Sequence, residues 1–93
     1  MKRVFKYPLV MMDRNTIVLP KGSKILSVES QKDDIVVYAI VDDSVSTEVE
    51  EHVFLIRGTG HPADDVDGCD FLNTVKLYGD TLIFHIFYGK EVS

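Results

Sequence analysis

The sequence predicts a small, mainly β protein: an antiparallel β-sandwich or squat barrel of about six to seven strands, with at most one short helical turn. Almost every apolar run is short and rich in Val, Ile, Phe and Tyr. No window of about eleven or more residues keeps the i, i+3, i+4, i+7 spacing of an amphipathic helix. The length of 93 residues fits a single domain over 1–93. Because so short a chain buries only about 60–65% of its unfolded surface, we expect a homo-oligomer.

Four runs in the first half of the chain have the composition of strands and are bounded by turn residues: RVFKYPL (3–9), TIVLPKG (16–22), SKILSVES (23–30) and IVVYAIVD (35–42). Pro8 has no amide N–H, which predicts that the first run is an edge strand. A polar turn at 31–34 leads into the fourth run. Since both faces of 35–42 are apolar, we expect this strand to be covered on both sides, by sheet or by a neighbouring chain.

The second half begins with a polar connection at 42–51 and resumes as a strand in HVFLIRG (52–58). The run FLNTVKLYGDTLIFHIFYG (71–89) predicts a hairpin around a two-residue turn formed by Gly79 and Asp80. We expect a short helical turn at 63–67. His52 is expected to be exposed, and His85 to be a packed core histidine with local hydrogen bonds.

Charge and composition exclude several classes of function. Ten basic against fifteen acidic residues give a net charge of −5, which opposes general binding to nucleic acids or anionic membranes. The apolar run PLVMM near the start is too short for a signal peptide or a membrane span, so a cytoplasmic location is expected. The single cysteine, Cys69, excludes an intrachain disulfide and a multi-cysteine zinc site.

The stretch RGTGHP (57–62) follows a strand and holds the candidate ligand-binding residues Arg57, Gly58, Thr59, Gly60 and His61. Successive backbone N–H groups of the Gly-Thr-Gly unit can form a concave cradle for an anion, and Arg57 and His61 are suited to phosphate. The structural alternative is an irregular turn in which the glycines take positive φ and Pro62 stiffens the chain. The motif is shorter than a Walker loop and lacks its lysine.

The same loop offers candidates for two further kinds of site, a cation site and a nucleophilic site. Asp65 and Asp67 are weak candidates for a hard cation, with additional oxygen and nitrogen donors from Asp64, Asp70 and His61. Their spacing fits no EF-hand, and a solvated acidic loop is the alternative. A nucleophile would have to be Cys69 or Thr59 with His61 as the nearest base. No cofactor is indicated, and we predict that the protein is not an enzyme.

Four segments together resemble a family of small phage and prophage proteins of unknown function: KYPL (6–9), LPKGSKILSV (19–28), GTGHP (58–62) and LNTVKLYGDTLIFHIF (72–87). The resemblance covers nearly the whole chain. It implies a setting in the host cytoplasm and the role of a non-enzymatic accessory or counter-defence factor, by analogy only.

Two functions follow for such a factor. In the first, the loop from Arg57 to Pro62 lines a pocket that sequesters a small phosphorylated or nucleotide-like ligand. Arg57 then supplies a bidentate charge and His61 a hydrogen-bond donor. In the second, the protein is an interaction module whose acidic and aromatic surface binds and inhibits a host protein.

Overall fold

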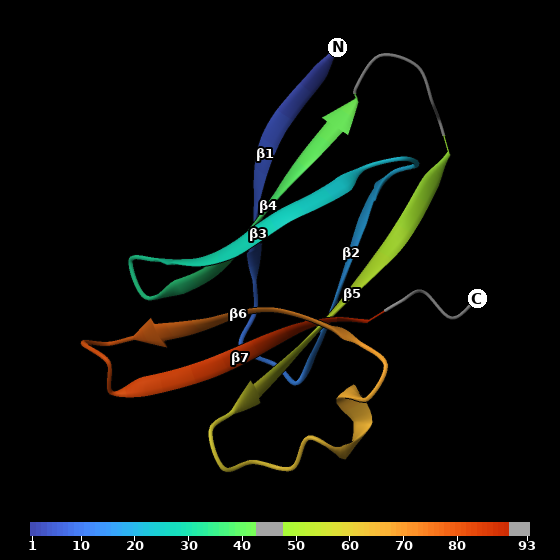
Figure 1. Ribbon diagram of the computed structural model, residues 1–93. Coiled ribbons are helices and arrows are strands. Elements are labelled where there is room, and N and C mark those ends of the chain that lie inside the picture. The colour runs from blue at the N-terminus through green and yellow to red at the C-terminus, as the bar shows by residue number, and fades with distance from the viewer. Residues whose placement is uncertain (43–47, 90–93) are drawn as a thin grey trace.

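The computed structural model describes residues 1–42 and 48–89. Seven strands form two antiparallel sheets (Figure 1), with the bounds β1 Lys2–Leu9, β2 Arg14–Pro20, β3 Lys24–Gln31, β4 Asp34–Asp42, β5 Val49–Gly58, β6 Asp70–Leu77 and β7 Leu82–Gly89. One sheet has the order β1-β4-β3 and the other β2-β5-β7-β6. A 3-10 turn, η1 (Asp64–Val66), is the one helical element of the described part and lies inside the expected range 63–67. The prediction of a small, mainly β sandwich is therefore confirmed.

The core lies between the two sheets and is built from alternate positions of their strands. Its fully or nearly fully buried members are Leu9, Val28, Ile35, Val37, Phe54, Ile56, Val75, Leu77 and Ile86. Each such side chain contributes about 1.5–3 kcal/mol through the apolar surface that it removes from water. Polar contacts also tie the sheets: Asn73 Nδ2 on β6 donates to the carbonyl oxygen of Val28 on β3 at 2.6 Å.

Strand β4 is the central strand of its sheet, with β1 and β3 as neighbours on its two sides. Its inward side chains join the core, as the apolar pattern predicts. On the outer face, Lys6 Nζ of β1 donates to Gln31 Oε1 of β3 at 2.7 Å. This contact bridges β4 next to Val36, which is only 3% exposed. Part of the second face of β4 is thus covered by the chain's own long polar side chains.

Two boundaries differ from the sequence predictions. The hairpin of β6 and β7 closes with the pair Leu77 and Leu82, so its connection has four residues rather than the two expected. Tyr78 leaves the strand with a φ of 53° and donates its N–H to Asp33 Oδ1 at 2.8 Å, a tertiary contact that local turn propensity does not reveal.

Strand β5 already begins at Val49, within the expected polar connection 42–51, of which 43–47 lie outside the described residues. Strand β1 is an edge, as predicted.

The prediction for His52 was wrong, because this side chain is buried and only 6% exposed. Strand β5 runs between β2 and β7, and the His52 ring stacks on Tyr88 of β7 with 5.8 Å between ring centroids. His52 Nδ1 lies 2.6 Å from the Tyr88 hydroxyl, whereas Nε2 has no hydrogen-bond partner in the described part of the chain. The acidic neighbours Glu50 and Glu51 suggested a solvated position, but the sheet covers the histidine.

Candidate functional site

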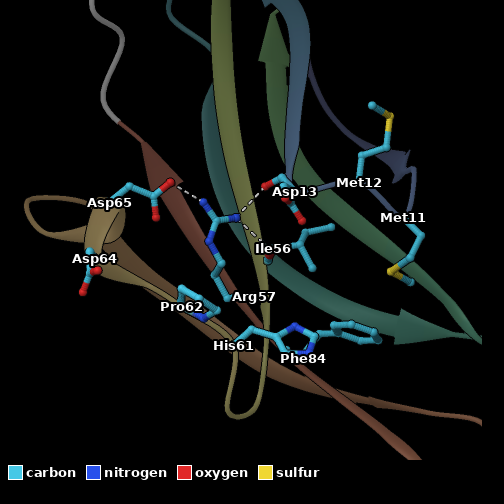
Figure 2. Close-up of a pocket in the computed structure, with 11 residues that line it drawn as sticks. Met11, Met12, Asp13, Ile56, Arg57, His61, Pro62, Asp64, Asp65 and Phe84 are labelled. Atoms are coloured by element: carbon cyan, nitrogen blue, oxygen red, sulfur yellow. Dashed lines mark hydrogen bonds and ion pairs between the residues drawn. The ribbon is translucent and has the colours of Figure 1, made fainter.

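A pocket of about 480 Å3 lies where the β1–β2 loop (10–13) meets the β5–β6 loop (59–69) (Figure 2). We call it the two-loop pocket. Its walls come from both loops and from the ends of β5 and β7: Met11, Met12, Asp13, Ile56, Arg57, Gly58, His61, Pro62, Asp64, Asp65 and Phe84. Segments more than forty residues apart in the sequence therefore share one concave surface.

The β1–β2 loop is held by Asn15, a buried polar residue with 7% exposure. Its side chain accepts a hydrogen bond from the Val10 N–H at 2.9 Å and donates to the carbonyl oxygens of Val10 at 3.0 Å and Met12 at 3.3 Å. An asparagine amide can donate and accept at once, which this double role requires. The loop so fixed presents Met11 and Met12, which are 53% and 62% exposed, at the rim of the pocket.

The β5–β6 loop turns sharply at the glycines of the Gly-Thr-Gly unit. The His61 N–H donates to the Gly58 carbonyl oxygen at 3.0 Å, and Gly60 has a φ of +87°, which favours glycine. A Cβ atom on Gly58 would lie only 2.8 Å from His61 Nδ1, so the ring packs directly over the glycine. Figure 2 shows the same ring beside Phe84.

Arg57 is the central polar group of the pocket, and its side chain is 11% exposed. Its Nη1 donates to the carbonyl oxygens of Asp13 at 2.8 Å and Ile56 at 2.9 Å, and its Nη2 donates to Asp65 Oδ2 at 2.5 Å (Figure 2). These bonds join β5 to both loops. A guanidinium has five N–H groups, so the three bonds leave two for other acceptors.

The pocket carries more acid than base. Three of its lining residues are aspartates, Asp13, Asp64 and Asp65, and one is an arginine. Asp65 is paired with Arg57, whereas neither Asp13 nor Asp64 has an ion-pair partner among the described residues. With His61 neutral, the lining residues have two formal negative charges in excess.

The structure brings together some of the candidate ligand-binding residues and separates others. Arg57, Gly58 and His61 line the two-loop pocket, whereas Thr59 and Gly60 do not. The Thr59 N–H donates to the carbonyl oxygen of Ile83 at 3.4 Å. The amides of Thr59 and His61 are therefore already hydrogen-bonded within the protein, and neither is available to an anion unless its bond breaks.

The Thr59 side chain belongs to a separate hydrogen-bonded row on the outer face of the second sheet. Its Oγ1 lies 2.8 Å from His85 Nε2, and His85 Nδ1 lies 2.9 Å from Thr74 Oγ1. His85 faces Arg57 on β5 and Thr74 on β6 in the strand register. The half-buried His85 thus anchors the β5–β6 loop to the sheet through Thr59. The expectation of a core histidine was wrong, because alternation along β7 turns His85 to the face opposite the buried Ile86, although its hydrogen bonds are local, as expected.

The structure also places the candidate metal ligands and the candidate nucleophiles. Asp65 contacts Arg57, and no group of three or more His, Cys, Asp or Glu side chains within 1–42 and 48–89 is arranged to hold a metal ion. Thr59 lies beside His85 rather than beside His61. Cys69 is half-buried, and its Sγ lies 3.8 Å from the point that a Cβ atom added to Gly89 would occupy. Within the same ranges, no helix has the length and apolar character needed to cross a membrane.

The sequence reasoning missed the part of the pocket that comes from the β1–β2 loop, namely Met11, Met12 and Asp13. From the sequence, the run PLVMM serves only to exclude a signal peptide and a membrane span, and no site is predicted there. Three consecutive large apolar residues between two strands, followed by an acid, are a usable signal, because such residues in a turn are usually polar.

The comparisons with known proteins identify the family of the chain but no function. A family model described as a domain of unknown function, DUF7352, matches residues 1–93. No curated protein and no solved structure matches the chain. The match spans the whole sequence, and the expectation of a family of unknown function is confirmed. The chain belongs to the DUF7352 family.

Proposed function

We propose that the protein is a non-enzymatic binding protein that holds its ligand in the two-loop pocket. The observation that carries the proposal is the position of Arg57, whose guanidinium is oriented by two backbone carbonyl groups at the polar end of a pocket with apolar walls. A few oriented polar groups in a mainly apolar concave surface are typical of ligand sites. Both candidate nucleophiles, Thr59 and Cys69, lie outside the pocket, which supports binding rather than catalysis there.

The ligand expected from the sequence is a small phosphorylated or nucleotide-like molecule. Arg57 supports this class, because its two remaining N–H groups can bind phosphate oxygens. Such a ligand has to replace Asp65 on Nη2 or share the guanidinium with it. In the phage setting that the resemblance implies, the protein acts in the host cytoplasm as an accessory or counter-defence factor that sequesters the ligand.

The second candidate is an interaction module that inhibits a host protein. The observation that favours it is the exposed apolar rim formed by Val10, Met11 and Met12, which are 59%, 53% and 62% exposed. Consecutive exposed apolar side chains beside a pocket are typical of surfaces that bind other proteins. A homo-oligomer, expected from the small size of the chain, is compatible with both candidates.

Isothermal titration with ADP, inorganic phosphate and candidate host proteins tests the proposal. Arg57→Ala should abolish binding in the pocket, and Arg14→Ala, which removes an exposed arginine outside it, should leave affinity unchanged. Circular dichroism establishes that both variants are folded. Full affinity in a folded Arg57→Ala variant would contradict the role of Arg57.

A further inference from the structure

We infer that the two-loop pocket receives a basic side chain, Arg or Lys, next to an apolar residue in an exposed segment of a partner protein. The inference rests on the proposed function, that the pocket binds, and develops its second candidate, the interaction module, by naming the chemistry of the occupant. It differs from the ligand expected from the loop sequence, because the folded pocket contains acids that the loop motif does not include.

The first argument is the balance of charge. Asp13 comes from the β1–β2 loop and Asp64 from η1, so each of the two loops contributes an acidic residue to the pocket lining. Neither has an ion-pair partner among the described residues, while the guanidinium of Arg57 is paired with Asp65. The excess of two negative formal charges among the lining residues favours a cation over an anion as the occupant. The net charge of −5 of the chain acts in the same direction.

The second argument is the apolar wall. Phe84 and Pro62 contribute apolar surface to the pocket, and Met11 and Met12 provide flexible thioether side chains at the rim. Methionines adapt their shape to different partners and are common at surfaces that bind varied peptides. The aliphatic stem of an arginine or lysine packs on such a wall while its charged end reaches a carboxylate.

The third argument distinguishes a protein segment from a small free cation. The apolar rim continues beyond the pocket to Val10, which is 59% exposed and is not among the lining residues. A free amine occupies only the acidic part of this surface. A segment with an apolar residue beside its basic one covers both the pocket and the rim, and removes more apolar surface from water.

The test is a titration of the 15N-labelled full chain, followed by NMR, with two matched peptides, Ac-Leu-Arg-Leu-NH2 and Ac-Leu-Glu-Leu-NH2, and with ADP. The arginine peptide should shift the amide signals of both pocket loops with saturation. It should bind at least about fivefold more tightly than the glutamate peptide, and raising NaCl from about 0.05 M to about 0.5 M should weaken it, since salt screens exposed charges.

A charge-neutral pocket variant makes the test specific. Asp13→Asn combined with Asp64→Asn should lower the affinity for the arginine peptide several-fold, and Asp80→Asn, which removes an exposed acid outside the pocket, should not. Equal or tighter binding of the glutamate peptide or ADP in the pocket overturns the inference and leaves the pocket as a binding site. If none of the three probes shifts pocket signals, the inference and the proposed function are both contradicted.

Discussion

Asp65 Oδ2 on η1 lies 2.5 Å from Arg57 Nη2 at the end of β5, and the two side chains differ greatly in exposure. The Arg57 side chain is 11% exposed, and that of Asp65 is 65% exposed. The arginine is further held by backbone carbonyls of Ile56 and Asp13, so the carboxylate is the replaceable partner of a fixed cation. The β5–β6 loop is therefore fastened across the pocket by a bond that solvent and ligands can reach.

Replacing Asp65 by Asn should destabilise the protein by only about 0.5–1 kcal/mol, because exposed ion pairs contribute little. The variant keeps a hydrogen-bond acceptor but removes the charge next to Arg57. Urea unfolding measures the change, and Asp64→Asn is the matched control, since it removes a carboxylate of the same turn that has no ion pair among the described residues. A loss above about 2 kcal/mol in Asp65→Asn would show that the pair is not a weak surface contact.

Asn15 should be the most sensitive position of the β1–β2 loop. Asn15→Ala removes one acceptor and one donor group that make three hydrogen bonds to the loop backbone, and it should cost about 2–3 kcal/mol. Asn15→Asp keeps the acceptor for the Val10 N–H and loses the donor.

Chemical unfolding at neutral pH should therefore show that Asn15→Asp is clearly less stable than the wild type. Hydrogen exchange of the Val10 amide provides a local measurement, and it should become faster in Asn15→Ala. Unchanged stability in both variants would mean that the loop is held by other contacts.

Gly58 and Gly60 should respond to alanine for different reasons. In Gly58→Ala the new Cβ meets the His61 ring at 2.8–2.9 Å, so the exposed ring has to move and the pocket changes shape. In Gly60→Ala the Cβ meets no atom within 4 Å, but a φ of +87° costs an alanine about 1 kcal/mol or more.

A second substitution separates the two effects. His61→Ala should restore the stability lost in Gly58→Ala, and it should not restore that lost in Gly60→Ala. Thermal unfolding of the three single variants and the two double variants measures this pattern. Rescue of both glycine variants by His61→Ala would contradict the assignment.

His52 and Tyr88 should be coupled. Tyr88→Phe removes the hydroxyl at 2.6 Å from His52 Nδ1 and leaves that buried nitrogen without this partner, at a cost of about 1–2 kcal/mol. His52→Phe removes both ring nitrogens, including the unpartnered Nε2, and keeps an aromatic ring on Tyr88. The double variant should therefore be more stable than Tyr88→Phe alone. Additive losses in a double-mutant cycle would show that the two side chains do not interact energetically.

Much of the fold could be predicted from the sequence because the strands of this protein are short and clearly bounded. The apolar run 35–42 became β4, and the turn at 63–67 contains η1. The edge position of β1 followed from Pro8 and the ladder it cannot extend. These features depend on local composition, which can be read directly from the sequence.

The candidate site was predictable only in part, since its second wall is a tertiary feature. The Gly-Thr-Gly motif drew attention to Arg57 and His61, which line the pocket. The approach of Met12 and Asp13 from the other loop depends on the pairing of β2 with β5, which local patterns do not specify. The burial of His52 was missed for the same reason, because it follows from the position of β5 between two strands.

The two-loop pocket is the proposed binding surface of this protein. The most direct test is an NMR screen of the 15N-labelled chain with a library of small fragments, which requires no knowledge of the natural ligand. We predict that saturable shifts concentrate in the amides of 11–13, 56–65 and Phe84, and that Arg57→Ala reduces them while Arg14→Ala does not. Saturable shifts that gather elsewhere, or no saturable shift in these segments, would contradict the claim.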